Sequence, residues 1–418
     1  MKTRNFDIVT HRNKNVHSIS FALVLPMGPM DEPLGKAGIT HLVEHLCYRR
    51  AGRFTHKDLY SKCEELGTKV AARTGKDFIQ FNFICRVQVF LEVLAIFRSM
   101  LYEVNYCESD LVLEKKVIVA EIHEKDETNA DSIINTLWSR DSYRTPILGT
   151  IESVADISLS DAINYKKDLL SNGGVIFVFG NFYESHITKI KELFGASLFA
   201  NEATNDTVKH KNIGFASRQS ESSVTFVADK FDDCDIYYAF DLSVSGRNRI
   251  RKIICMQMLH SILFQGDAAY MTEIIREEKG LIYSFFSRIE IIENELICLF
   301  HFSQNRDLLQ NILQEVEARL LNFIAEEKYL KYVKAFFCDN ISLLYDNQED
   351  LTNSYTANYI NFKKVVTPEE YSAIVKSLDP QEYLNIMRKL LKSKKIYVWG
   401  NIPRAERLLI KTILAKNS

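Results

Sequence analysis

The sequence predicts two similar α/β domains of about 200 residues each, one after the other along the chain. Three observations support this fold class. An apolar strand pattern that closes with Gly-Asn occurs twice, as VIFVFGN at 175–181 and as KIYVWGN at 395–401. Each copy stands between two helical patterns, and the copies lie about 220 residues apart. A period of that length is too long for a solenoid unit, so it indicates a duplicated domain.

The patterns around the two copies also correspond. Segments 158–170 and 377–391 precede the Gly-Asn strands, and a Ser or Asp that favours a helix N-terminus stands near the start of each segment. The strand patterns at 19–28 and 236–246 each lead into a long helical pattern. The shared order and spacing favour duplication over a chance recurrence of similar strands.

The polar segment NEATNDTVKHKN at 201–212 has no apolar periodicity and is the best candidate for a linker. It divides the chain into a first domain at 1–200 and a second domain at 213–418. With 46% hydrophobic and 25% charged residues, the composition allows each domain a full core.

Charge and apolar patterning argue against several classes of protein. The net charge is −2, so nucleic acid is not favoured as a partner. No window reaches the roughly 18 apolar residues of a membrane span, and the first residues lack the apolar core of a secretory signal. The eight cysteines form no Cys-x-x-Cys pair, which is typical of reduced, mostly buried thiols. We therefore expect a cytoplasmic protein.

The segment GITHLVEHLCYRR at 38–50 carries the first candidate chemistry. On a helix with 100° per residue, one face holds the apolar side chains Ile39, Leu42, Val43 and Leu46. The opposite face holds the polar side chains His41, Glu44, His45 and Tyr48. Imidazoles at i and i+4 are able to bind one zinc ion, and a carboxylate beside the ion suits a general base. The alternative is two surface histidines beside a glutamate.

A second helical pattern at 108–127 supplies a candidate third ligand. Glu114 and Glu121 share one side of it with the apolar residues Leu111, Val117 and Ile118. Carboxylates on an apolar face are costly unless a metal ion or a positive partner compensates them. Glu121 would complete a His-His-Glu set, and Glu114 would orient a ligand or the water. Ordinary salt bridges are the alternative for both, and His123 points elsewhere as a surface histidine.

Together these segments resemble the insulinase/pitrilysin family of zinc peptidases, which includes mitochondrial processing peptidase and bacterial processing peptidases. His-x-x-Glu-His with a distant Glu is the inverted zincin signature. The family places that Glu about 76 residues after the last His, which is the separation of His45 and Glu121. REEKGLIYSFF resembles the family's C-terminal motif of an Arg and a Tyr seven residues apart, here Arg276 and Tyr283.

The resemblance implies an α+β fold with the architecture of the processing peptidases, in which each duplicated domain packs helices on a mostly antiparallel sheet. It implies the zinc ligands His41, His45 and Glu121. Glu44 would be the general base and Glu114 a supporting catalytic group. Arg276 and Tyr283 would bind the peptide substrate or stabilise the oxyanion. Chains of this size usually pair around a closed chamber, as a homodimer or as a heterodimer with a related chain.

Two segments depart from the family pattern. The family's edge strand adds the peptide as an extra β-strand, and its counterpart here reads GTKVAARTGKD. Ala71 replaces the usual Asn and Gly75 replaces the usual Ser. Main-chain pairing with the substrate through Ala71, Ala72 and Arg73 would survive these changes, whereas the side-chain amide of the usual Asn is lost. The turn before the Arg/Tyr motif, FQGDAAYMTEII, lacks the usual Gly and Ser residues. Both departures favour a specialised substrate.

We therefore expect a zinc-dependent endopeptidase, specialised for processing or maturation, that cleaves peptides inside a dimeric chamber. The alternative is a non-catalytic structural or regulatory subunit of the same fold. Such chains commonly lose the His-x-x-Glu-His residues, and this chain retains them. A third hypothesis is a metal hydrolase with a non-peptide substrate, although no phosphate-binding loop supports it.

Overall fold

The computed structural model describes residues 6–124, 128–198, 223–229, 233–283, 285–324 and 326–415. It divides into two compact units. The first comprises Met1–Glu127, Arg140–Ile213 and Leu343–Val365, and the second comprises Thr128–Ser139, Gly214–Ser342 and Val366–Ser418. The predicted linker at 201–212 lies outside the described residues, so the predicted domain boundaries stay a prediction.

The first unit is built on a six-stranded sheet with the order β5-β6-β2-β7-β1-β8. Its strands are β1 (Phe6–Arg12), β2 (Ser18–Leu25), β5 (Val70–Gly75), β6 (Phe78–Arg86), β7 (Gly174–Gly180) and β8 (Ser197–Leu198). The pairs β5·β6, β6·β2 and β2·β7 are antiparallel, and β1 is parallel to β7 and β8. The two-residue strands β3 (Arg50–Ala51) and β4 (Phe54–Thr55) form a separate hairpin.

The second unit repeats this topology in a five-stranded sheet with the order β11-β12-β10-β13-β9. Its strands are β9 (Ser223–Ala228), β10 (Asp233–Ser243), β11 (Phe286–Ile292), β12 (Glu295–Asn305) and β13 (Lys395–Gly400). Position by position, the directions match those of the first five strands of the other sheet. The predicted duplication, with a mostly antiparallel sheet in each domain, is confirmed.

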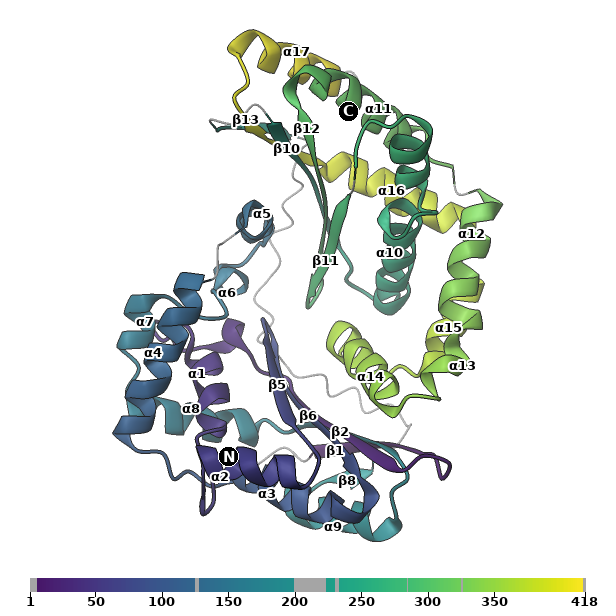
Figure 1. Cartoon of the computed structure of the whole chain (residues 1–418). Helices are drawn as coiled ribbons and strands as arrows, with labels where there is room; N and C mark the ends of the chain where they lie inside the picture. The colour runs from purple at the N-terminus through teal and green to yellow at the C-terminus, as the bar shows by residue number, and fades with distance from the viewer. Residues whose placement is uncertain are drawn as a thin grey trace. The chain divides into compact units, whose positions relative to one another are not determined.

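Helices pack one face of the first sheet, as Figure 1 shows for α3 and α9. The helices of this unit are α1 (Ile39–Cys47), α2 (His56–Glu65), α3 (Phe90–Tyr102), α4 (Glu108–Glu124), α6 (Asp141–Arg144), α7 (Ile151–Ala155), α8 (Leu159–Ser171), α9 (Glu184–Phe194) and α14 (Gln348–Phe362). Apolar side chains from α1, α3, α8 and α9 join those of the strands in one core. The core therefore anchors α1, the helix of the His-x-x-Glu-His segment.

The helices of the second unit are α5 (Asn129–Leu137), α10 (Arg249–Phe264), α11 (Leu309–Leu321), α12 (Glu327–Lys334), α15 (Pro368–Ser377), α16 (Pro380–Ser393) and α17 (Arg404–Ala415). The short helix α13 (Ile341–Leu344) lies at the boundary of the units. Short 3-10 turns are η1 (Pro29–Asp31), η2 (Val87–Val89) and η4 (Arg306–Leu308), and η3 (Thr272–Glu278) and η5 (Ala335–Asp339) are π-helical. Among the described residues, no helix is long and apolar enough to cross a membrane.

Each half of the sequence contributes one helix to the unit built mainly by the other half. In the first unit, α14 covers the second face of the sheet, where Tyr355 packs against Phe177 and Phe179 at ring-centroid distances of 6.4 and 4.8 Å (Figure 1). The Thr352 hydroxyl donates a hydrogen bond to Ser20 Oγ at 2.8 Å. In the second unit, α5 contacts β10 and β12. The sequence did not predict this exchange.

Candidate active site

The helix α1 positions the candidate metal ligands. Its apolar residues Ile39, Leu42, Val43 and Leu46 are buried, as predicted. The helix begins at Gly38, whose φ is +89° and whose missing side chain would lie 2.6 Å from the carbonyl oxygen of Leu148. Gly38 offers no capping side chain, so the Glu32 carboxylate accepts from the backbone N–H groups of Gly38 and Thr40, each at 2.9 Å.

Three predicted ligands come together at one point. His41 Nε2 lies 3.0 Å from Glu121 Oε2, and His45 Nε2 lies 3.5 Å from Glu121 Oε1. One ligand atom from each side chain lies within 4.8 Å of the others. Two imidazole nitrogens and one carboxylate oxygen are a donor set that zinc prefers, and three protein ligands leave a fourth position open. The residues present therefore fit a catalytic zinc ion.

Glu114 lies behind this set and fixes the ring of His45. Glu114 Oε2 is 3.0 Å from His45 Nδ1, and Arg49 Nε donates to the other carboxylate oxygen. Glu114 is 4% exposed. Burial raises its pKa, but the hydrogen bonds from His45 and Arg49 outweigh burial and lower the pKa overall. Arg49 is thus the positive partner that a buried carboxylate requires.

The predicted apolar surroundings of the two glutamates on α4 need one correction. Leu111 and Ile118 are buried, whereas Val117 is 36% exposed. On the helical wheel, Leu111 and Ile118 lie on one side of Glu114, and Val117 lies on the other. The core therefore faces the Leu111 side, and Glu121 lies at its edge.

Glu44 is held between α1 and the edge strand. Its carboxylate is 8% exposed, accepts a hydrogen bond from Thr74 Oγ1 of β5, and lies 3.7 Å from His41 Nδ1. Burial raises the pKa of Glu44, but the neighbouring His41 imidazole and the hydrogen bond from Thr74 outweigh burial and lower the pKa. Burial lowers the pKa of His41, but the carboxylates of Glu44 and Glu121 outweigh burial, so the His41 pKa is raised. Glu44 is therefore ionised at neutral pH and able to accept a proton.

The candidate substrate strand is β5, which forms an edge of the first sheet. Ala71, Ala72 and Arg73 occupy its central positions, with Ala71 directly opposite Asn82 of β6. The side-chain carboxamide of Asn82 therefore lies beside Ala71, the residue that stands where Asn is usual in the family. A strand at a sheet edge carries backbone groups that are able to pair with an extended peptide.

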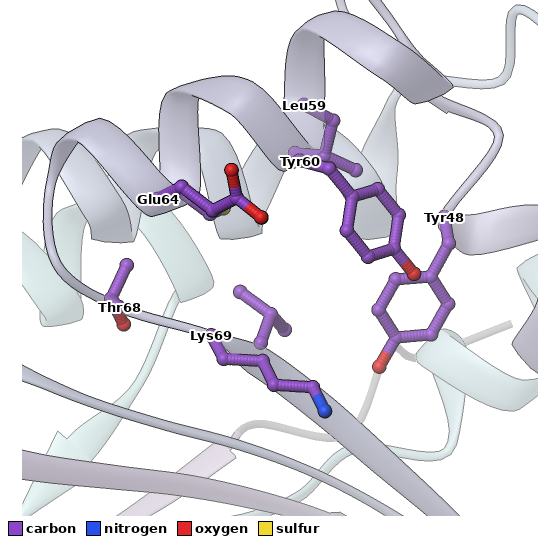
Figure 2. Close-up of a pocket in the computed structure, with 8 residues that line it drawn as sticks. Tyr48, Leu59, Tyr60, Glu64, Thr68 and Lys69 are labelled. Carbon is purple, nitrogen blue, oxygen red and sulfur yellow. The ribbon is translucent and has the colours of Figure 1, made fainter.

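A cavity of about 330 Å³ adjoins the start of β5. Its lining residues are Tyr48, Leu59, Tyr60, Cys63, Glu64, Thr68, Lys69 and Val70. Figure 2 shows the rings of Tyr48 and Tyr60 at one end, with Glu64 and Lys69 on opposite walls. Tyr48 follows His45 by three residues, and its buried hydroxyl has no hydrogen-bond partner among the described residues. The cavity combines aromatic walls with a free polar atom, as side-chain pockets do.

The Arg/Tyr motif belongs to the second unit. Arg276 lies in the π-helix η3 and forms ion pairs with Asp267 and Glu277, each at 3.2 Å. Tyr283 is 89% exposed. Neither side chain belongs to the unit that holds His41, so their predicted roles stay predictions.

Sequence reasoning missed three residues that support the site: Thr74, Arg49 and Glu32. Thr74 lay within a recognised segment, but only the packing of β5 against α1 pairs it with Glu44. Arg49 follows His45 by four residues on the same helical face, a signal that would have placed it beside the metal ligands. Glu32 gave no periodic signal because it lies in a loop.

The fold and the site define a two-domain protein with a candidate metal site of the inverted His-x-x-Glu-His type. The profile of the family described as Insulinase (Peptidase family M16) matches residues 7–151. The profile described as Peptidase M16 inactive domain matches residues 157–337. The two matches cover most of the chain, which therefore belongs to the insulinase family, peptidase family M16.

Proteins of several bacteria are similar to this chain in sequence. The chain is 22% identical over 319 residues to the uncharacterized zinc protease YmxG of Bacillus subtilis, a match that covers 75% of each protein. It is 20% identical over 395 residues to an uncharacterized zinc protease of Rickettsia bellii, covering 92% of this chain and 93% of the relative.

Solved structures share the fold. A protease from Helicobacter pylori superposes with a TM-score of 0.77 at 14% identity, covering 96% of this chain and 98% of that one. The first half of the periplasmic protease PqqL from Escherichia coli gives a TM-score of 0.76 at 15% identity, with coverages of 98% and 94%.

Proposed function

We propose that the protein is a zinc-dependent endopeptidase. The observation that carries this proposal is the convergence of His41 Nε2 and His45 Nε2 on the Glu121 carboxylate, with Glu44 on the same helix beside them. The zinc-protease names of the relatives support it. A bound zinc ion would supply Lewis acidity, which lowers the pKa of water and polarises a carbonyl.

The residues of the chain have distinct tasks in this proposal. Glu44 accepts the proton of the attacking water and delivers it to the leaving nitrogen. Thr74 holds the Glu44 carboxylate through its hydroxyl. Glu114 accepts from His45 Nδ1, which leaves Nε2 of that ring as the metal ligand.

The peptide substrate would bind as an added strand along β5, because main-chain pairing needs only a free edge. A side chain of this peptide would enter the cavity of Figure 2, which opens at the start of the same strand. We further propose a processing or maturation role for a paired chain in the cytoplasm, with the substrate enclosed in a chamber.

A second candidate function is a non-catalytic subunit of the same fold. The match of residues 157–337 to a profile described as an inactive domain favours it. That match lies entirely outside the segment that holds His41, Glu44 and Glu121, so it does not describe the candidate metal site itself.

Metal content and turnover separate the two functions. We expect about one zinc ion per chain by elemental analysis, removable by a chelator. His41→Ala and His45→Ala should lose zinc and peptide cleavage together. Glu44→Gln should retain zinc and lose cleavage by roughly a hundredfold or more, because proton transfer to a positioned base contributes about that much. Cleavage products of a peptide library are identified by mass spectrometry.

His123→Ala is the matched control, since His123 is an exposed histidine on α4. It should retain both zinc and activity. Zinc content that is unchanged in His41→Ala and His45→Ala contradicts the metal site. Normal zinc content without cleavage of any peptide supports the non-catalytic subunit.

A further inference from the structure

We propose that Arg73 selects peptides with an acidic side chain opposite it on the added strand. This inference rests on the proposed binding of substrate along β5. It adds a charge requirement on the face of β5 that carries Arg73, in addition to the cavity at α2.

The two faces of β5 have different surroundings. Thr74 points toward α1, where its hydroxyl reaches Glu44. Side chains alternate along a strand, so Arg73 points to the other face, together with Ala71 and Gly75. A peptide paired with β5 alternates in the same way, and residues directly opposite have Cβ atoms about 5 Å apart. One set of its side chains therefore faces the metal site and the other set faces Arg73.

Arg73 is held in a fixed position by uncharged partners. Its Nη2 donates to Gln80 Oε1 at 2.8 Å, and its guanidinium lies 5.1 Å from the centre of the Phe78 ring. The Phe78 ring fills the space of a side chain at Gly75, because a Cβ there would lie 2.1 Å from Phe78 Cε1. The departure from Ser to Gly at position 75 thus makes room for the ring that supports Arg73.

The guanidinium has no carboxylate partner among the described residues. Gln80 is bonded to one nitrogen, so other N–H donors remain for a ligand. Arg73 itself is exposed, and on the side away from Phe78 its neighbour Ala71 carries only a methyl group. A preorganised arginine of this kind matches the planar carboxylate of Asp or Glu.

Binding to the full-length Glu44→Gln chain, which is expected not to turn over, tests the proposal. The probes are fluorescein-labelled decapeptides of Ala and Ser in which one position carries Glu, Gln or Lys, and this position is moved along the peptide. Fluorescence anisotropy should show that Glu binds roughly tenfold tighter than Gln at one register, because a charge-assisted pair contributes about that factor. High salt should reduce the difference.

Arg73 variants made in the Glu44→Gln chain test whether the charge of residue 73 sets the preference for acidic peptides. Arg73→Gln should abolish the preference, and Arg73→Glu should shift it to Lys. Arg86→Gln, at an exposed end of β6, makes the same charge change and should leave the preference intact. Equal binding of Glu and Gln peptides at every register overturns the inference, as does a Glu preference that survives in Arg73→Glu. If no peptide binds, both the inference about Arg73 and the proposed binding of the peptide along β5 are overturned.

Cleavage by the unsubstituted chain is read separately. If the chain cleaves the peptide, the acidic residue should lie within about two residues of the cut bond. The reason is that Arg73 is adjacent on β5 to Thr74, whose hydroxyl contacts the candidate base Glu44. An Arg73-dependent Glu preference in binding without any cleavage supports the inference and contradicts the proposed enzymatic function.

Discussion

Thr74 connects the candidate substrate strand with the candidate base. Its hydroxyl donates to the Glu44 carboxylate, and this hydrogen bond, together with the nearby His41 imidazole, lowers the Glu44 pKa against the effect of burial. A substrate strand that pairs with β5 would therefore bind beside the residue that orients the proton acceptor. This coupling of binding and chemistry depends on a single hydroxyl.

Thr74→Val removes that hydroxyl with little change of volume. We expect kcat to fall roughly tenfold, because Glu44 loses a charge-assisted hydrogen bond of about 1.5 kcal/mol. The Glu44 pKa should rise, so activity should be lost at a higher pH on the acidic side of the profile. A pH series of kcat/KM measures this shift. Thr188→Val, on the exposed side of α9, is the matched control. An unchanged acidic limb contradicts the role of Thr74.

Helical periodicity was sufficient to predict which residues of α1 face the candidate metal site and which face the core. It placed His41, Glu44 and His45 together because neighbours on one helix depend only on local geometry. Periodicity wrongly grouped Val117 with the buried residues of α4. The pattern shows which residues flank Glu114 and Glu121, but it does not show on which flank the core lies. It also gave no contact between Thr74 and Glu44, because that contact depends on tertiary packing.

At the scale of the element, α1 depends on a cap from outside the helix. Glu32 accepts from two N–H groups of the first turn, which Gly38 is unable to cap. Burial raises the pKa of Glu32 to about 7, although its hydrogen bonds with Thr40 and Gly38 act to lower it. The charge of this cap therefore changes near neutral pH.

We expect the stability of the chain relative to Glu32→Gln to fall by roughly 2 kcal/mol from about pH 5 to about pH 8. A raised pKa means that the folded chain binds the proton more tightly than the unfolded chain. The stabilisation is complete below about pH 4.5 and is lost as the pH rises through about 7. Denaturant unfolding at several pH values measures it.

Glu184→Gln, in the exposed first turn of α9, is the matched control and should show no such trend. A stability difference between the chain and Glu32→Gln that is constant with pH contradicts the shifted pKa. The capping residues Ser158 of α8 and Asp379 of α16 lie near the predicted starts of these helices. Those caps were predictable because a cap is local, whereas the Glu32 cap acts from six and eight residues away.

At the scale of the whole molecule, the repeated Gly-Asn strands predicted the duplicated sheets. The two sheets share their strand order because each half repeats the same sequence of elements. The exchange of α5 and α14 was not predictable, since an amphipathic helix does not encode which sheet it covers. Tertiary contacts reveal the assignment, such as the packing of Tyr355 on Phe177 and Phe179 for α14 and the contacts of α5 with β10 and β12.

The family resemblance implies that, in a pair, Arg276 and Tyr283 of one chain would serve the zinc site of the other chain, and mixed dimers test this. We expect an Arg276→Ala/Tyr283→Phe chain and a Glu44→Gln chain, each inactive alone, to recover about a quarter of the activity when equal amounts re-associate. The reason is that half of the dimers are mixed, and each of these has one site with all residues intact. The control replaces the second chain by Glu44→Gln/Arg276→Ala/Tyr283→Phe, which should recover nothing. Mixed dimers without recovery contradict action across the dimer.

The helix exchange also affects how the chain is made. The ribosome releases the metal-site helix α1 early, but the sheet beside it lacks α14 until residues 348–362 have emerged. From their own synthesis until Tyr355 emerges, Phe177 and Phe179 have no cover from that ring. The first unit is therefore completed only after most of the second unit has been synthesised. The candidate metal ligands are all made by residue 121, but the sheet beside them is covered on both faces only once α14 has emerged.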